Sequence, residues 1–507
     1  MTWLKFCGVV FAIALSLFIF SLDQCIMATA FPAIADNFNA LDKMAWLVNS
    51  VFLTLIGFSL AYLQWCQFVP AKHISMFAIL VFEIGVLVSS IANSVPVLLA
   101  GRMISGVGAA GLYNGAMLIV TETFELHTRA KVLSFFGITF GVAAVVGPSV
   151  GGTLVQHLSW RWCFFISLPF GMISFIMIVV LIKARPPLGF EAIYTGYDWT
   201  MLDRLLHCDW LGIAMTLAWG VCLIMAMSEG GRSLPWDSAA QIFLLVMLGV
   251  LPILFALWEY YLGKHAMLQL KILRSRNMRS ALAVGMCTYA SCSVVLFFLA
   301  EMLRALYNVE GTIGGLMILP LIAAQTVSIM IAGEIVIRTN LAWPLLVLGP
   351  FLATIASFMM STSTAKTPVS FTVGLSVLTG IGAGIISQSV VILAQLQYRD
   401  DSELIGAATG LVIFSNNLGR FIGASIGSCI FGNVMIHQLS AQVPNLDKDL
   451  LVLVTHNAHS IWTQVPEVIR PLVVQAYRVT LNDVFIASAC FGALGVISAF
   501  FAEWYRL

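Results

Sequence analysis

Residues 141–154 have the sequence GVAAVVGPSVGGTL, which is apolar enough to lie inside a membrane but contains a proline and four glycines. In an ordinary helix these residue types cost roughly 3 and 1 kcal/mol each. Glycine lets a neighbouring helix approach closely, and proline removes one backbone hydrogen bond and permits a kink. We therefore expect Gly147, Pro148, Gly151 and Gly152 to belong to a tightly packed helix that can change its bend. A kinked helix with no special role is the alternative.

The composition places the whole chain in a membrane. Of its 507 residues, 60% are hydrophobic and only 10% are charged, and the mean hydropathy is +0.97. A water-soluble protein of this length cannot bury so much apolar surface, so the sequence predicts an all-α protein that crosses the membrane many times. The net charge of +1 gives no reason to expect a nucleic acid or an acidic partner.

Patterns typical of metal sites and nucleotide chemistry are missing from the sequence. The ten cysteines are scattered, mostly in apolar runs, without a CxxC pair. Cys287 and Cys292 lack a metal-ligand spacing, and buried thiols behave as small hydrophobes. No GxxxxGKS/T phosphate-binding loop occurs, which argues against ATP hydrolysis by this chain. We therefore expect no metal, no cofactor and no enzymatic activity.

A helix that crosses a membrane needs about 20 apolar residues, and fourteen segments of the chain meet this requirement. No small-residue cleavage site follows the first apolar run, so this run is predicted to be the first span rather than a signal peptide. The predicted spans lie near residues 5–26, 44–66, 73–93, 96–120, 131–157, 162–183, 209–228, 239–262, 279–304, 312–336, 341–361, 368–396, 404–436 and 480–503.

A polar segment between the sixth and seventh spans suggests that the spans are grouped as 6 + 2 + 6. Many transporters consist of two six-helix halves with the substrate site between them, so the two further spans would be an insertion. The predicted parts are an N-terminal bundle (1–183), a cytoplasmic linker (184–208), two inserted helices (209–262) and a C-terminal bundle (279–507) with an extracellular loop at about 438–478.

The distribution of lysine and arginine predicts the orientation, because cytoplasmic loops are enriched in both. With the N-terminus inside, about fifteen of these residues lie on the inner side and about eight on the outer side. Much of the excess comes from the loop at 264–279. We therefore expect both termini in the cytoplasm.

The sequence GPSVGG (147–152) resembles the antiporter motif in the fifth helix of the drug:proton antiporters of the major facilitator superfamily. That motif has two further glycines upstream. This chain has Ser134 and Ala143 at those positions, and both are small enough to preserve close packing.

The fourth span is also similar to this family. LLAGRMISGVGAAG (98–111) resembles the family's motif with a buried arginine, which is Arg102 here, followed by Gly106 and Gly108. Ser105 stands where a glutamine is usual.

Three more stretches carry the resemblance. LDQCIMATAFPAIADNF (22–38) in the first span is similar to the family's LDxTIVNVALPxI, with Asp23 as its acid. LSWRWCFFISLPFG (158–171) and CDWLG (208–212) resemble stretches of the fourteen-span, fungal-type members. The resemblance is strongest over residues 20–230 and implies the major facilitator fold and proton-coupled efflux.

Two segments depart from the family pattern. The family's loop between helices two and three carries a glycine and an aspartate with basic residues after them, and it is thought to latch the two halves at the inner face. Here AYLQWCQFVPAKHISM (61–76) retains only Lys72. The ninth span, VVLFFLAEMLRALYNVEG (294–311), differs where relatives usually have a Tyr-Leu-Pro run, so the substrate cannot be carried over from the family.

Charged residues inside the predicted spans are candidates for function, because a charge at the centre of a span costs about 2.5–3.5 kcal/mol on insertion scales. Asp23 and Arg102 both fall in the outer halves of their spans and can meet across the bundle. A carboxylate that pairs alternately with a cation and with a proton is the physical basis of proton coupling. The alternative is an exposed Asp23 at the outer boundary and an Arg102 that bonds helix carbonyls. Glu83 in VFEIGV is the third candidate for proton coupling.

Polar residues of the last six spans are candidates for a substrate cavity. Glu301 and Arg304 are three residues apart, so a simple intrahelical ion pair is their alternative role. Three glycines recur every four residues and predict a close-packed ridge, namely Gly419, Gly423 and Gly427. The cavity candidates are Gln388, Gln395, Asn416, Asn417, Arg420, Glu301 and Arg304.

With the resemblance, these features predict a proton-coupled efflux transporter of the plasma membrane that exports amphipathic small molecules such as fungal secondary metabolites (mycotoxins) or drugs. Its partners would be the small-molecule substrate, protons and the lipid bilayer, and a monomer is expected. One alternative is a proton-coupled importer, for example of an iron–siderophore complex. The other is a transport-inactive membrane sensor, which the changed loop at 61–76 supports.

Overall fold

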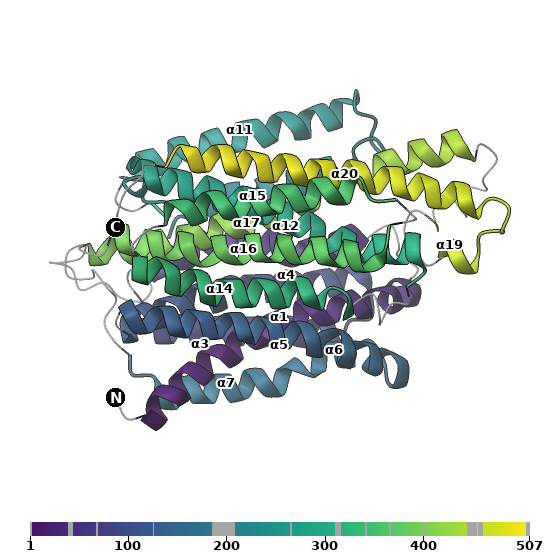
Figure 1. Cartoon of the computed structure of the whole chain (residues 1–507). Coiled ribbons are helices and arrows are strands. Elements are labelled where there is room, and N and C mark those ends of the chain that lie inside the picture. Colours follow the sequence, from purple (N-terminus) through teal and green to yellow (C-terminus); the bar gives the residue numbers. More distant parts are fainter. Residues whose placement is uncertain are drawn as a thin grey trace.

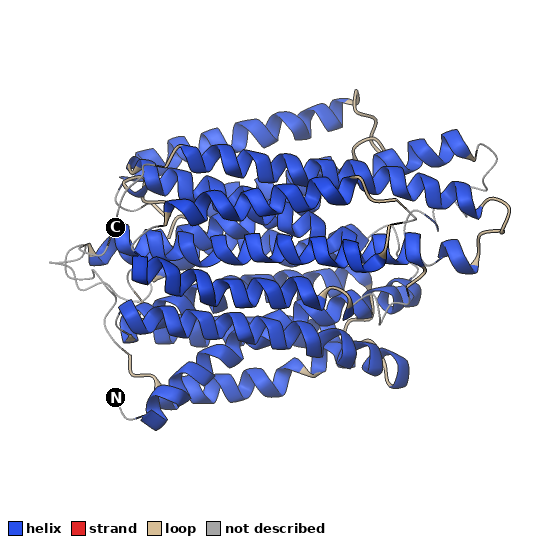
Figure 2. Cartoon of the chain, in the orientation of Figure 1, coloured by secondary structure: helices blue, strands red, loops and turns tan. Residues whose placement is uncertain are grey.

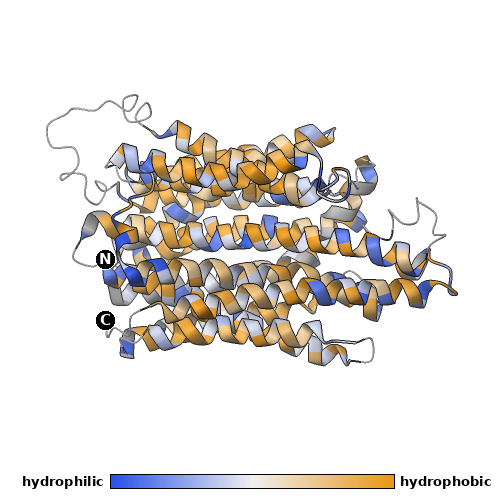
Figure 3. Cartoon of the chain, turned by 90° about the horizontal axis from the view of Figure 1, so that it is seen from above, coloured by the Kyte–Doolittle hydropathy of each residue, from blue (hydrophilic) through white to orange (hydrophobic). Residues whose placement is uncertain are grey.

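The computed structural model describes residues 3–38, 44–66, 69–124, 126–184, 208–263, 266–309, 316–339, 342–364, 367–398, 401–443, 454 and 460–502. Figure 1 shows one bundle of long helices that run roughly parallel to one another. The regular elements of these residues are helices joined by loops (Figure 2). Hydrophobic residues cover the helices over most of their length (Figure 3). The predicted all-α membrane fold is therefore confirmed.

The first helices in chain order are α1 (Trp3–Phe38), α2 (Met44–Trp65), α3 (Ala71–Ser90), α4 (Val95–Thr123), α5 (Leu126–His157), α6 (Trp162–Phe165) and α7 (Ser167–Leu181). They are followed by α10 (Trp210–Glu229), α11 (Ala239–Leu262) and the short 3-10 helix η3 (Ile272–Arg274). The last helices are α12 (Arg276–Tyr307), α14 (Leu319–Thr339), α15 (Trp343–Ser361), α16 (Val369–Gln397), α17 (Ser402–Gln442), α19 (Ser460–Thr463) and α20 (Arg470–Phe500).

The helices match the predicted spans. Thirteen described segments are long and apolar enough to cross a membrane, and the remaining predicted span, 44–66, forms α2. The start of α1 and the end of α20 lie at the same end of the bundle (Figure 1), as an even number of crossings requires.

Several helix ends differ from the predicted bounds. α1 continues to Phe38 instead of ending near residue 26, and α20 begins at Arg470 instead of near 480. The loop expected at 438–478 is therefore partly helical, although residues 444–453 and 455–459 lie outside the described part. Hydropathy marks where an apolar run stops, whereas helical hydrogen bonds continue into polar residues. Nearly all of the linker predicted at 184–208 also lies outside the described residues.

The first and the last helices pack in the same order. α4 packs on α1, α2 and α3, and α16 packs in the same way on α12, α14 and α15. α1 also contacts α5 and α7, as α12 contacts α17 and α20. The 6 + 2 + 6 division stays a prediction, and this repeated packing supports it.

Contacts between the two groups of helices run along α5 with α14 and along α2 with α17. At the first contact the Thr326 hydroxyl of α14 donates to the Gly137 carbonyl of α5 at 3.1 Å. At the second, Leu63 of α2 lies so close to Gly410 of α17 that a Cβ on the glycine would overlap the leucine side chain. A glycine is thus required at the second contact, whereas a Cβ at Gly137 would make an ordinary contact with Thr326 at 3.6 Å.

The glycine ridge predicted in α17 is confirmed. A Cβ at Gly419 would lie 2.1 Å from the Met286 carbonyl oxygen, and one at Gly423 would lie 2.3 Å from that of Ala290. Because both positions lack a side chain, the backbones of α17 and α12 come into direct contact.

Asp209 ties α10 and α11 to the rest of the bundle. Its Oδ1 accepts hydrogen bonds from the Gly212 amide of α10 and the Trp258 indole N–H of α11, both at 2.8 Å. Its own amide donates to Gln64 Oε1 of α2 at 3.1 Å. The side chain is buried, so one residue of the CDWLG stretch joins three helices.

Replacing Asp209 with Ala is expected to lower the stability of the protein. The change leaves the half-buried Trp258 indole N–H and the first turn of α10 without their acceptor, which costs about 2 kcal/mol. The thermal unfolding midpoint of the purified protein in detergent measures the effect. Asp237→Ala, at an exposed position, is the matched control, and equal midpoints for the two variants would contradict the role of Asp209.

Candidate functional site

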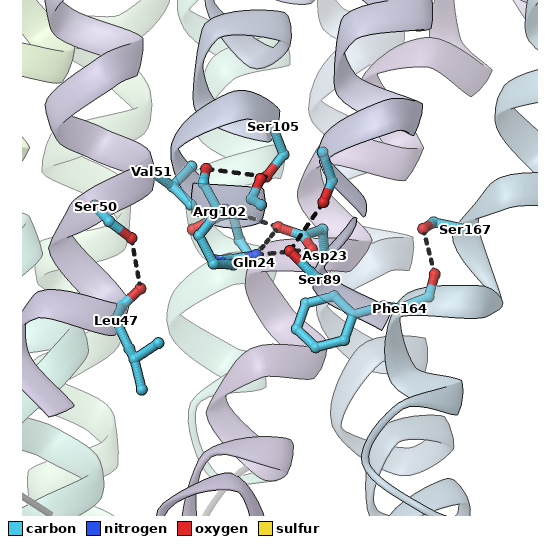
Figure 4. A network of polar contacts seen from close by, with 12 residues as sticks. Asp23, Gln24, Leu47, Ser50, Val51, Ser89, Arg102, Ser105, Phe164 and Ser167 are labelled. Atoms are coloured by element: carbon cyan, nitrogen blue, oxygen red, sulfur yellow. Dashed lines mark hydrogen bonds and ion pairs between the residues drawn. The ribbon is translucent and has the colours of Figure 1, made fainter. Parts of the chain in front are cut away.

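Asp23 of α1 and Arg102 of α4 form a buried ion pair in the N-terminal part of the bundle. Arg102 Nη1 lies 2.6 Å from Asp23 Oδ2 and 2.9 Å from Oδ1, and each side chain is 2% exposed. Gln24 Nε2 donates to Asp23 Oδ2 at 3.1 Å, and the guanidinium carbon lies 5.9 Å from the centre of the Phe164 ring. Figure 4 shows the two charged groups pointing toward each other.

The pair lies deeper than the sequence suggested. Asp23 was expected near the outer end of a span that stops at about residue 26, but α1 continues to Phe38 and Asp23 is well inside it. The alternative of an exposed Asp23 is therefore wrong. The alternative of an Arg102 that bonds only helix carbonyls is also wrong, because its partner is the Asp23 carboxylate.

Glu83 of α3 is a second buried acid close to this pair. Its side chain packs so closely on α7 that a Cβ at Gly171 would overlap the carboxylate, and it lies within electrostatic reach of Asp23. In the described part of the chain neither carboxylate oxygen has a hydrogen-bond partner. The structure thus brings all three proton-coupling candidates into one region.

The GPSVGG segment packs on α1 next to Asp23. α5 is helical through this segment, and a Cβ at Gly147 would lie 2.5 Å from the Cβ of Cys25. The Gly151 carbonyl accepts a weak hydrogen bond from the Cys163 thiol at 3.8 Å, whereas nothing lies within 4 Å of a Cβ built at Gly152. The backbone of Pro148 is helical, and its side chain lies outside the described atoms. Close packing thus occurs at Gly147, and bending stays a prediction.

Glycines of α4 bring its neighbours close to Arg102. A Cβ at Gly106 would lie 2.4 Å from the Val51 carbonyl oxygen of α2, and one at Gly108 would lie 2.3 Å from the Phe82 amide nitrogen of α3. The Thr54 hydroxyl of α2 also donates to the Met103 carbonyl at 2.8 Å. α4 is therefore wedged between α2 and α3, which fixes the position of its arginine.

The cavity candidates fall into separate groups. Arg420 lies over the Tyr289 ring of α12, with its guanidinium carbon 4.5 Å from the ring centre. Asn416 of α17, one turn before Arg420, is buried against Gly285 of α12. Asn417 is half-buried.

The remaining cavity candidates have neighbours other than Arg420. Gln388 and Gln395 of α16 are buried, and their amide nitrogens have no partner in the described part of the chain. Glu301 and Arg304 form the intrahelical pair of the simpler interpretation, at 3.6 Å.

Tyr113 and Tyr289, which lie near Arg420, were not among the residues predicted from the sequence. Tyr113 of α4 interacts electrostatically with both Tyr289 and Arg420, and its ring centre lies 6.3 Å from that of Phe140 in α5. One signal was present in the sequence. Tyr113 follows Arg102 by eleven residues, or three helical turns, and so shares its face of the helix.

Thirteen of the described segments are long and apolar enough to cross a membrane, and they enclose a buried ion pair where α1 and α4 cross. The family model of the Major Facilitator Superfamily matches residues 13–424. The chain belongs to the major facilitator superfamily.

Two similar superfamily members are fungal. The aspyridones efflux protein of Neocamarosporium betae is 30% identical over 505 residues, covering 99% of this chain and 88% of that protein. The efflux pump hmp6 of Hypomyces subiculosus is 28% identical over 503 residues, with the same coverage of 99% and 88%. Among solved structures, the proton:xylose symporter XylE shares the fold, with a TM-score of 0.59, 12% identity and coverage of 97% of this chain and 94% of that one.

Gly147→Ala is expected to disturb the contact between α5 and α1, because the new methyl group would collide with Cys25. The matched change is Gly152→Ala, which enters open space and gains about 1 kcal/mol of helix propensity. We expect a lower thermal unfolding midpoint for the first variant and an unchanged or higher one for the second. If both midpoints rise equally, Gly147 does not mark a close contact.

Breaking the buried pair from one side is expected to cost more than removing both partners. Asp23→Leu or Arg102→Met alone leaves an uncompensated buried charge, at about 3–5 kcal/mol, whereas apolar replacement of both is close to neutral. Chemical denaturation of the single and double variants in detergent measures this coupling. The exposed Glu334–Arg338 pair is the control, with an expected coupling of about 0–1 kcal/mol. Additive effects of the two single changes would show that the charges are not coupled.

Proposed function

We propose that this chain is a proton-coupled efflux transporter that exports amphipathic small molecules, such as fungal secondary metabolites or drugs, across the plasma membrane. Membership of the superfamily and the full-length similarity to fungal efflux proteins support export. The observation that carries proton coupling is the buried Asp23–Arg102 pair, which lies beside the antiporter motif. The proposal includes cytoplasmic termini and no enzymatic activity.

In the proposed cycle a proton reaches Asp23 from the outside. The neutral acid no longer compensates the Arg102 charge, so the contact between α1 and α4 weakens and the two halves rearrange around α5–α14 and α2–α17. The proton leaves toward the cytoplasm as substrate binds. Close packing of Gly147 on Cys25 keeps α5 against α1 and opposes leakage along this contact.

Glu83 is the second group proposed to carry a proton. A buried carboxyl group without a hydrogen-bond partner is accommodated most cheaply in its neutral form. Because Glu83 lies within electrostatic reach of Asp23, the two acids repel each other when both are charged. Protonation of one therefore changes the energy of the other, which links two proton sites in one half of the bundle.

The proton gradient supplies sufficient energy for this cycle. One proton that crosses about 150 mV and about one pH unit releases roughly 5 kcal/mol. For a neutral substrate this supports a concentration ratio on the order of a thousandfold.

The test is substrate-dependent proton movement in proteoliposomes that hold a pH gradient. Lipophilic cations, neutral toxins and organic acids are added in turn to wild type, Asp23→Asn and Asp23→Glu. We expect some compounds to dissipate the gradient with wild type, loss of this response in Asp23→Asn, and partial retention in Asp23→Glu, which still carries a proton. Asp237→Asn, at an exposed position, should behave as wild type.

An unchanged proton dependence in Asp23→Asn would remove Asp23 from the cycle. No response to any compound from well-folded wild-type protein would contradict proton-coupled efflux as a whole.

A further inference from the structure

Arg420 is a charged residue in the interior of α17 whose charge the described residues do not neutralise. Arg102, Arg304 and Arg338 each lie within 4 Å of a carboxylate. Within the described residues Arg420 has no acidic partner and no hydrogen bond, and its contact is the Tyr289 ring. A charge at the centre of a span costs about 2.5–3.5 kcal/mol, so an arginine without an acidic partner there indicates a functional site.

The packing of α17 on α12 holds the Arg420 side chain in a defined place. It leaves the helix between Gly419 and Gly423, where the two backbones are in contact. Tyr289, on the facing side of α12, is 3% exposed and lies in the cation–π range of the guanidinium. This contact covers one face of the guanidinium and leaves its N–H edges without acceptors.

Tyr113 of the N-terminal helix α4 lies within electrostatic reach of the same guanidinium. It also interacts electrostatically with Tyr289, and Phe140 of α5 lies beside it. Arg420, Tyr113 and Phe140 each remain partly exposed although they lie in the interior of long helices. A partly exposed cation thus lies on the Tyr289 ring of α12 and within electrostatic reach of Tyr113 of α4.

We propose that Arg420, Tyr289 and Tyr113 form a substrate subsite that binds the anionic group of a planar organic acid. The guanidinium edge pairs with a carboxylate or enolate in a two-pronged, charge-assisted contact. The Tyr113 hydroxyl donates a further hydrogen bond, and the rings of Tyr113 and Phe140 pack on the planar part of the acid. The subsite rests on the proposed transport function, whose substrate class it specifies.

The experiment compares two probes of the same shape, 2-naphthoate and its neutral amide, 2-naphthamide. Equilibrium dialysis of each radiolabelled probe against the purified full chain in detergent at neutral pH gives the two dissociation constants, after subtraction of uptake by empty micelles. We expect wild type to bind the acid at least about tenfold more tightly than the amide, which corresponds to 1.4 kcal/mol. Arg420→Gln should bind the two probes equally, and Arg420→Lys should keep part of the preference.

Two further variants separate the subsite from general effects. Arg338→Gln removes an exposed cation and should keep the wild-type preference. Tyr113→Phe should weaken binding of the acid several-fold and leave the amide unchanged. If purified Arg420→Gln is not monodisperse, the reduced preference of Arg420→Lys and the weaker acid binding of Tyr113→Phe test the subsite instead.

Equal binding of the two probes by wild type overturns the subsite, as does a preference that survives in Arg420→Gln. Dialysis requires neither a gradient nor transport, so its outcome is independent of the proteoliposome test. A preference for the acid without proton-coupled flux would leave the binding subsite and refute the transport cycle. Proton-coupled flux without a preference for the acid would support the transport cycle and refute the binding subsite.

Discussion

A carboxylate and a guanidinium in direct contact, shielded from water at the crossing of α1 and α4, are the interaction on which the N-terminal half depends. Each group is stable in its place only while the other is present. The surrounding helices maintain that contact through small residues. Gly106 and Gly108 hold α4 between α2 and α3, and Gly147 holds α5 against α1 beside Asp23. Five helices therefore pack around one pair of charges, and neither charge is tolerated there without the other.

The cation of α4 and the cation of α17 have different surroundings. Arg102 is neutralised by Asp23, whereas Arg420 has no acidic partner among the described residues and lies on the Tyr289 ring. If the proposals hold, the first half handles the proton and the second half recognises the charge of the cargo. The contacts along α5–α14 and α2–α17 join the helices that would carry out these two tasks.

Much of this organisation could be predicted from the sequence. The apolar segments are long enough to indicate the spans, and a charged residue in such a segment stands out, so Asp23, Glu83, Arg102 and Arg420 were all identified. The ends of α1 and α20 were missed because hydropathy does not report helical hydrogen bonds in polar residues. Tyr113 and Tyr289 were missed because an aromatic residue in an apolar segment reads the same whether it faces lipid, protein or a cavity. Gly147 and Gly152 are likewise indistinguishable in the sequence. Only the structure shows that the first lies in a close contact and the second faces open space.

The pairing of α10 with α11 has a consequence for how such a protein can change over evolution. The two helices make one crossing out and one crossing back, so α12 starts on the side of the membrane on which it would start without them. An added or lost pair preserves the orientation of every later helix, whereas a single helix would invert the whole second half. Asp209 joins α10 to α11 and also ties the pair to α2, so loss of the pair would preserve the topology but expose its contact face on the bundle. A helix pair of this kind can therefore be gained or lost without a change in the topology of the other helices.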